Sequence, residues 1–147
     1  MTEIQFHTGV AEPLVHVMKL LRKAEAQGAR LAVLGPAALL DRISQHLWSD
    51  DPQSFRPHLR LGAGQPPGPH LAPTPVWLVE RLESVPADVE RLLHLAGETA
   101  EAPPGFERFA RLYDIVGADP ASRLAGRQRW RHYADRGYAL SHHPMDG

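Results

Sequence analysis

Residues 13–36, PLVHVMKLLRKAEAQGARLAVLGP, join an amphipathic helix to an apolar strand and decide the fold class. Apolar side chains recur at three- and four-residue steps through residue 24, which places them on one face of a helix. Gly28 is suited to ending that helix. The run LAVL at 31–34 is typical of a central strand that is covered on both faces. This stretch therefore predicts a helix over Pro13–Gln27 that leads into a parallel-type sheet.

Apolar runs and helical periods alternate along the rest of the chain in the same way. We expect strands at Ile4–His7, Leu31–Leu34, Val76–Val79, Leu92–Leu95 and Leu112–Val116. We expect further helices from Pro36 to about Trp48 and from the cap Asp119, with Pro120 at its first position, to Gly137, and a short helical turn at Phe106–Ala110. Residues 50–75 are rich in proline and glycine and predict an exposed connection. The pattern predicts one α/β domain over residues 1–140 and a flexible tail over 141–147.

The composition excludes several classes of function. The 147 residues carry a net charge of -1 and contain no cysteine, which rules out disulfides, thiolate metal sites and cysteine nucleophiles. The lack of cysteine fits a cytoplasmic protein. The first residues show no basic start followed by an apolar run, so we expect no signal peptide. No apolar stretch approaches the roughly 20 residues that a membrane-spanning helix needs.

Catalytic and cofactor motifs are not found in the sequence. A dinucleotide site needs G-x-G-x-x-G between strand and helix, whereas the LAVL strand is followed by Gly35 and then Pro36. The nine histidines do not have the spacing of a metal site, and His7 and His94 are expected to be hydrogen-bonded structural residues. Neither G-x-S-x-G nor H-E-x-x-H occurs. We expect no cofactor, no metal and no catalytic activity.

The final helix concentrates positive charge beside an aromatic ring. Arg123, Arg127 and Arg131 recur every four residues and therefore lie along one side of the helix, on the same arc as Trp130. Like charges at this spacing cost a few tenths of a kcal/mol per pair, which a chain without a partner has little reason to accept. A row of guanidinium groups beside a flat ring suits a carboxylate-bearing ligand with an apolar end. The competing interpretation is that the ring packs on the sheet and the arginines are simply solvated.

A second aromatic pair occurs in LWSDDPQSFRPH, residues 47–58. Trp48 is placed at the end of a helix and Phe55 follows in a proline-flanked segment. Large aromatic side chains beside a loop are favoured anchors at protein interfaces. The alternative, that both rings cover the domain's own core, stays open from the sequence.

Two stretches, LWSDDPQSFRPH and YDIVGADPASRLAGRQRWRHYADRGYAL (113–140), are similar to the chi-subunit family of bacterial DNA polymerase III. The resemblance covers nearly the whole chain. It implies a Rossmann-like, mostly parallel sheet with helices on both faces and no nucleotide site. It also implies a non-catalytic adaptor that connects the clamp loader, through the psi subunit, to the acidic C-terminal tail of single-stranded-DNA-binding protein.

The resemblance also assigns residues to these two partners. The tail-binding pocket of the family falls on Val116, Arg123, Arg127, Trp130 and Arg131, and the psi-facing aromatics fall on Trp48 and Phe55. The sequence departs from the family pattern in that arginine replaces a frequent lysine at 123 and 131, tryptophan replaces tyrosine at 130, and Gly117 replaces a proline. The first three changes preserve charge and ring, whereas Gly117 is expected to loosen the rim of the pocket.

Two other functions compete with the adaptor. A single-stranded nucleic-acid-binding module would use the same arginines on phosphates and would bind oligonucleotides with a steep salt dependence. The net charge of -1 and the small number of aromatic platforms disfavour it. A small enzyme on a Rossmann-like scaffold would need a polar pocket with convergent titratable groups, and the sequence offers none.

Overall fold

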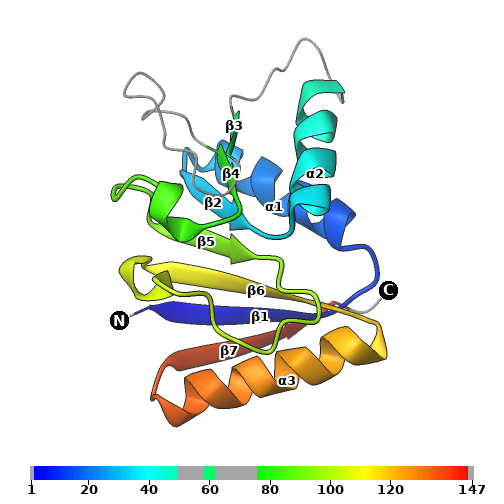
Figure 1. Cartoon of the computed structure of the whole chain (residues 1–147), viewed down its shortest axis with the longest axis vertical. Helices are drawn as coiled ribbons and strands as arrows, with labels where there is room; N and C mark the ends of the chain where they lie inside the picture. The colour runs from blue at the N-terminus through cyan, green and yellow to red at the C-terminus, as the bar shows by residue number, and fades with distance from the viewer. Residues whose placement is uncertain (1, 50–57, 62–75, 146–147) are drawn as a thin grey trace.

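The protein is described by a computed structural model that covers residues 2–49, 58–61 and 76–145. For residues 47–49, 58–61 and 84 only the backbone is described. Strands and helices alternate over most of the chain (Figure 1). In chain order the elements are β1 Glu3–Val10, α1 Pro13–Ala26, β2 Leu31–Leu34, α2 Ala37–Ser49, β3 His58–Leu61, β4 Val76–Val79, the 3-10 turn η3 Leu82–Ser84, β5 Arg91–His94, the 3-10 turn η4 Phe106–Arg108, β6 Arg111–Gly117, α3 Pro120–Asp135 and β7 Ala139–Pro144.

The strands form one sheet in the order β3-β4-β2-β5-β6-β1-β7. Every neighbouring pair in this part of the chain is parallel, as the alternation of strands and helices predicts. The continuous apolar strands β2 and β4 lie inside the sheet and are buried or nearly so on both faces. The predicted α/β class, with a Rossmann-like arrangement, is confirmed.

The strand order explains which helix covers which face. The connections through α1 and α2 move along the sheet toward β3, whereas the connection through α3 moves from β6 toward β7, in the opposite direction. Because crossovers between parallel strands are right-handed, opposite directions place the helices on opposite faces. Figure 1 agrees: α1 and α2 lie together, and α3 runs alongside β1 and β7.

Each face of the sheet has its own hydrophobic core. Val17 and Leu21 of α1 and Leu40 of α2 pack on one face, against side chains such as Leu93. Tyr133 of α3 packs on the other, in a cluster that also contains the buried side chains of the segment between β4 and β6. No helix among the described residues is long and apolar enough to span a bilayer.

Two strands lie where the sequence analysis expects none. β3 occurs within the stretch 50–75 that was expected to be an exposed connection; residues 50–57 and 62–75 lie outside the described residues. β7 extends to Pro144, so Ser141–Pro144 belong to the sheet instead of starting a flexible tail. β7 pairs with β1 from Glu3↔Ala139 to Thr8↔Pro144. Its polar residues conceal it in the sequence, because an edge strand is held by backbone hydrogen bonds more than by apolar burial.

Candidate functional site

A groove of about 770 Å³ lies between α3 and the strands β1, β6 and β7. All five residues that the sequence analysis assigns to one pocket line it. They are Val116, Arg123, Arg127, Trp130 and Arg131. The lining also includes residues that the sequence analysis does not select: Phe6, Thr8 and Gly9 of β1, Gly126 and Ala134 of α3, and His142 and Pro144 of β7. The spacing on α3 thus identifies one wall of the groove, and β1 and β7 supply the rest.

The start of α3 is held by a cap that the sequence predicts. The backbone N–H of Ser122 donates to the carboxylate of Asp119 over 3.0 Å, and this bond keeps the pKa of Asp119 below its ordinary value. Pro120 occupies the first turn, where its missing N–H costs nothing. A Cβ on Gly117 would lie 2.9 Å from a carboxylate oxygen of Asp119, so a side chain at this position would displace the capping carboxylate.

A glycine also allows α3 to lie directly on β6. A Cβ on Gly126 would lie 2.8 and 2.9 Å from the two γ-methyl groups of Val116. Such distances do not occur without a shift of one element, so the absence of a side chain at 126 sets how near the helix comes to the strand. The close approach brings Val116 into the groove wall beside the arginines of α3. The sequence analysis assigns no role to Gly126, and its contact with β6 follows from the structure.

Trp130 connects the groove to the core. Its ring meets Phe6 edge-on, with the ring centroids 5.1 Å apart, and meets His142 at 6.2 Å. The side chain is partly buried and packs against the core, yet it also lines the groove. The ring therefore packs on the sheet, as the competing interpretation expects, and it also faces the groove. Tyr133, three positions further along α3, is fully buried.

The three arginines of the predicted row are exposed to solvent. Within the described part of the chain, none of Arg123, Arg127 and Arg131 has a hydrogen-bond or ion-pair partner. Three unpaired guanidinium groups beside a half-buried ring are suited to an extended anionic chain that ends in an apolar side chain.

A fourth arginine of α3 is used differently, and the sequence analysis assigns it no role. Arg129 is completely buried, and it donates from Nε to Asp114 Oδ2 over 2.9 Å and from Nη2 to Asp114 Oδ1 over 2.8 Å. Its Nη1 donates to the carbonyl oxygen of Thr99. The signal was present in the strand LYDIV, because an acid inside a buried strand requires a partner.

The histidines only partly follow expectation. His7 shares a hydrogen bond of 2.8 Å with His16, whereas Nδ1 of His94 is buried without a partner among the described residues. Burial lowers the pKa of both His7 and His94 to about 4, so both are neutral at pH 7. Within the described ranges, no cluster of histidine and acidic side chains has the geometry of a metal site.

The second predicted surface is not tested by the structure. Trp48 belongs to the last turn of α2, but its side chain is not described, and Phe55 lies outside the described residues.

Comparison with known proteins identifies the family. The family model described as DNA polymerase III chi subunit, HolC, matches residues 1–141. The DNA polymerase III subunit chi of Pseudomonas aeruginosa is 28% identical over 160 aligned positions, which cover 99% of this chain and 98% of that protein. Because the family match spans nearly the whole chain, the protein belongs to the DNA polymerase III chi-subunit family, a family of replication accessory subunits.

Proposed function

We propose that this protein is an adaptor whose α3 groove binds the acidic C-terminal tail of single-stranded-DNA-binding protein. The observation that carries the proposal is the row of exposed arginines, unpaired among the described residues, beside the half-buried ring of Trp130 in a single groove. Such a tail ends in an Asp-aliphatic-Pro-Phe sequence with a free carboxylate in the resembled family. Its charge and its terminal ring complement the two halves of the groove.

Different residues of the groove would bind different parts of the tail. Arg127 lies between the other two arginines in sequence, and its guanidinium would bind the terminal carboxylate through two parallel hydrogen bonds. Val116 and Trp130 would hold the phenylalanine ring of the tail, because both are apolar and line the same groove as the arginines. A charge-assisted hydrogen bond contributes about 1.5–3 kcal/mol when it is shielded from water, and less at an exposed position such as this one.

The outer arginines would act mainly at longer range. Arg123 and Arg131 flank Arg127 by one helical turn on either side, close enough to attract the acidic residues of the tail without a direct contact. Their contribution would be to steer the approach of the peptide and to set its direction in the groove. Added salt would weaken this contribution, since the groove is open to solvent.

We further propose that the protein connects this tail to the clamp loader through the psi subunit, by way of Trp48 and Phe55. This part rests on the family resemblance of residues 47–58. It includes a cytoplasmic location, because bacterial chromosomes are replicated there. Co-purification with psi, before and after Trp48→Ala, tests it separately from the groove. Retention of psi by the alanine variant would contradict the role of Trp48.

A calorimetric titration with an acidic peptide that ends in Asp-aliphatic-Pro-Phe tests the groove. Arg127→Glu replaces the proposed carboxylate ligand by a like charge, so we expect its affinity to fall by at least about tenfold. Arg136→Glu is the matched control: it makes the same charge change at the end of the same helix, outside the groove lining, and should leave the affinity nearly unchanged. Amidation of the peptide's C-terminus should reproduce the loss.

The competing function, binding of single-stranded nucleic acid, draws on the same unpaired arginines. It predicts that an oligonucleotide binds without any peptide and that the logarithm of its affinity falls steeply with the logarithm of salt concentration. Wild-type affinity of Arg127→Glu for the peptide, together with a loss of oligonucleotide binding, would replace the adaptor by this alternative.

A further inference from the structure

A second cavity, of about 370 Å³, lies on the opposite face of the sheet, under α1. Its floor is formed by residues of the five adjacent strands β2, β5, β6, β1 and β7, and α1 forms its wall. On this face β1, β6 and β7 contribute Gln5, Tyr113 and His143, which are partly or fully exposed. Both faces of a parallel sheet are normally covered by apolar packing. This section of the sheet departs from that rule, because α3 lies on the other face and α1 alone borders the space.

The lining of the cavity is strongly biased in charge. It includes Lys23, Arg91 and Arg111 but no acidic residue in the described part of the chain. The whole protein carries a net charge of -1, so this bias is local. Arg91 and Arg111 are directly opposite each other on β5 and β6. Like charges in that position repel one another, and an anion between them would relieve the repulsion.

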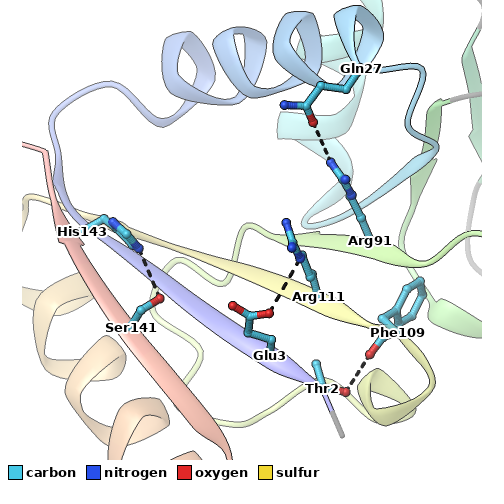
Figure 2. Close-up of polar contacts among 8 residues, drawn as sticks. All are labelled: Thr2, Glu3, Gln27, Arg91, Phe109, Arg111, Ser141 and His143. Carbon is cyan, nitrogen blue, oxygen red and sulfur yellow. Dashed lines mark hydrogen bonds and ion pairs between the residues drawn. The ribbon is translucent and has the colours of Figure 1, made fainter.

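The two arginines are held by weak partners. Figure 2 shows Arg91 and Arg111 extending on the same side of the sheet, toward the level of α1. Arg91 Nη1 donates to the side-chain oxygen of Gln27 over 3.0 Å, which positions the guanidinium without neutralising it. Arg111 Nε lies 3.8 Å from a carboxylate oxygen of Glu3, and both side chains are about half exposed. An exposed pair at this separation contributes little and can be opened by a competing anion.

The remaining walls are suited to an organic group. Leu20, Leu93 and Met145 are apolar, and the ring of Tyr113 adds a flat surface. His7 and His16 form the hydrogen-bonded pair at one end, and burial lowers the pKa of both, so they offer neutral hydrogen-bonding groups at pH 7. The volume lies within the range of small-molecule sites and exceeds what a bare inorganic ion requires.

We propose that this cavity is a second binding site, for a small organic phosphate monoester of about mononucleotide size. Lys23, Arg91 and Arg111 bring three positive charges and Glu3 one negative charge, a net of two that matches a phosphate carrying about -1.5 to -2 at pH 7. The phosphate lies between Arg91 and Arg111, and the organic body lies against Leu20, Leu93 and Tyr113. The site is separate from the α3 groove, and the inference goes beyond the proposed adaptor function.

Titration of the full chain with adenosine 5′-monophosphate, adenosine and inorganic phosphate at constant ionic strength tests the proposal, with NMR shifts of the arginine side-chain N–H groups as readout. We expect saturable binding of the monophosphate with a Kd of about 1 mM or lower, weaker binding of inorganic phosphate, and no binding of adenosine. The double variant Arg91→Gln/Arg111→Gln should bind the monophosphate with an affinity at least about tenfold lower than that of the wild type. Glu3→Gln removes the carboxylate that competes for Arg111 and should raise the affinity for the monophosphate severalfold.

Controls separate this site from the groove and from general charge effects. Arg81→Gln removes one exposed arginine outside the lining of both cavities and should change nothing. Arg127→Glu should leave monophosphate binding intact. An oligonucleotide can be tested with and without a 5′-phosphate. If only the phosphorylated form binds, the end of a nucleic-acid strand is the source of the phosphate. Equal binding by the double variant and the wild type, or no effect of Glu3→Gln, would overturn the proposal.

Discussion

The two sides of α3 use the same residue type in opposite ways. Arg129 is completely buried and donates two parallel hydrogen bonds to Asp114, whereas Arg127, two positions earlier, is exposed and has no partner among the described residues. Two residues along a helix correspond to a rotation of about 200°, so the two side chains leave the helix on nearly opposite sides. Burial obliges a charge to be paired inside the protein, while exposure leaves it available to a partner. The direction in which each arginine of α3 points therefore decides whether it is available to a partner; the number of arginines does not.

Removal of Asp114 should have the largest effect, because it leaves Arg129 charged and buried without its partner. We expect Asp114→Ala to lower the free energy of unfolding by about 3–5 kcal/mol, measured by urea denaturation at pH 7. Addition of Arg129→Met to this variant should restore part of the loss, since the stranded charge is then removed. If Asp114→Ala costs less than about 1 kcal/mol, the ion pair does not hold α3 in the way the geometry indicates.

Lowering the pH should reduce the stability of the fold through the buried side chain of His94. Burial lowers its pKa to about 4, and the neighbouring Asp114 opposes this shift only in part. Between pH 6.5 and pH 4 the unfolded chain binds a proton that the native chain does not, so stability falls as the pH falls through this window. The shift corresponds to a loss of about 3 kcal/mol, complete near pH 4. His7, whose pKa is also lowered to about 4, acts in the same direction.

Urea denaturation between pH 7 and pH 4 measures this effect. We expect His94→Gln, which cannot titrate, to show a shallower fall in stability than the wild type over the same range. A variant curve as steep as that of the wild type would mean that other groups cause the pH dependence.

The same contrast explains how far the sequence predicts the structure. Apolar runs such as LAVL and VWLV identify the central strands, because burial on both faces leaves a strong local signal. β7, with the sequence ALSHHP, was missed because its exposed edge position requires no apolar pattern. The central strands alone were sufficient to predict the fold class. The edge strand β7, which completes the groove, could not be predicted from the sequence pattern.

The candidate groove was predicted to the extent that a single helix determines it. Arg123, Arg127 and Arg131 share one side of α3 because of their four-residue spacing, and Trp130 lies beside them. No local spacing relates these residues to Phe6 or His142, which come from strands far away in the sequence. The burial of Arg129 was missed for the same reason, since Asp114 lies on another element.

The smallest effects should come from the outer arginines, and they sharpen the contrast with Arg129. Arg123→Gln and Arg131→Gln remove exposed charges, so each should change the free energy of unfolding by no more than about 0.5 kcal/mol. Each should weaken peptide binding by less than about 1 kcal/mol at low salt. Because charges are screened over about 10 Å at 0.1 M salt and about 3 Å at 1 M, the loss should vanish at high salt. Calorimetric titrations at these two salt concentrations measure it. A loss that persists at 1 M salt would instead indicate a direct, desolvated contact, and the outer arginines would then bind the peptide as closely as Arg127 does.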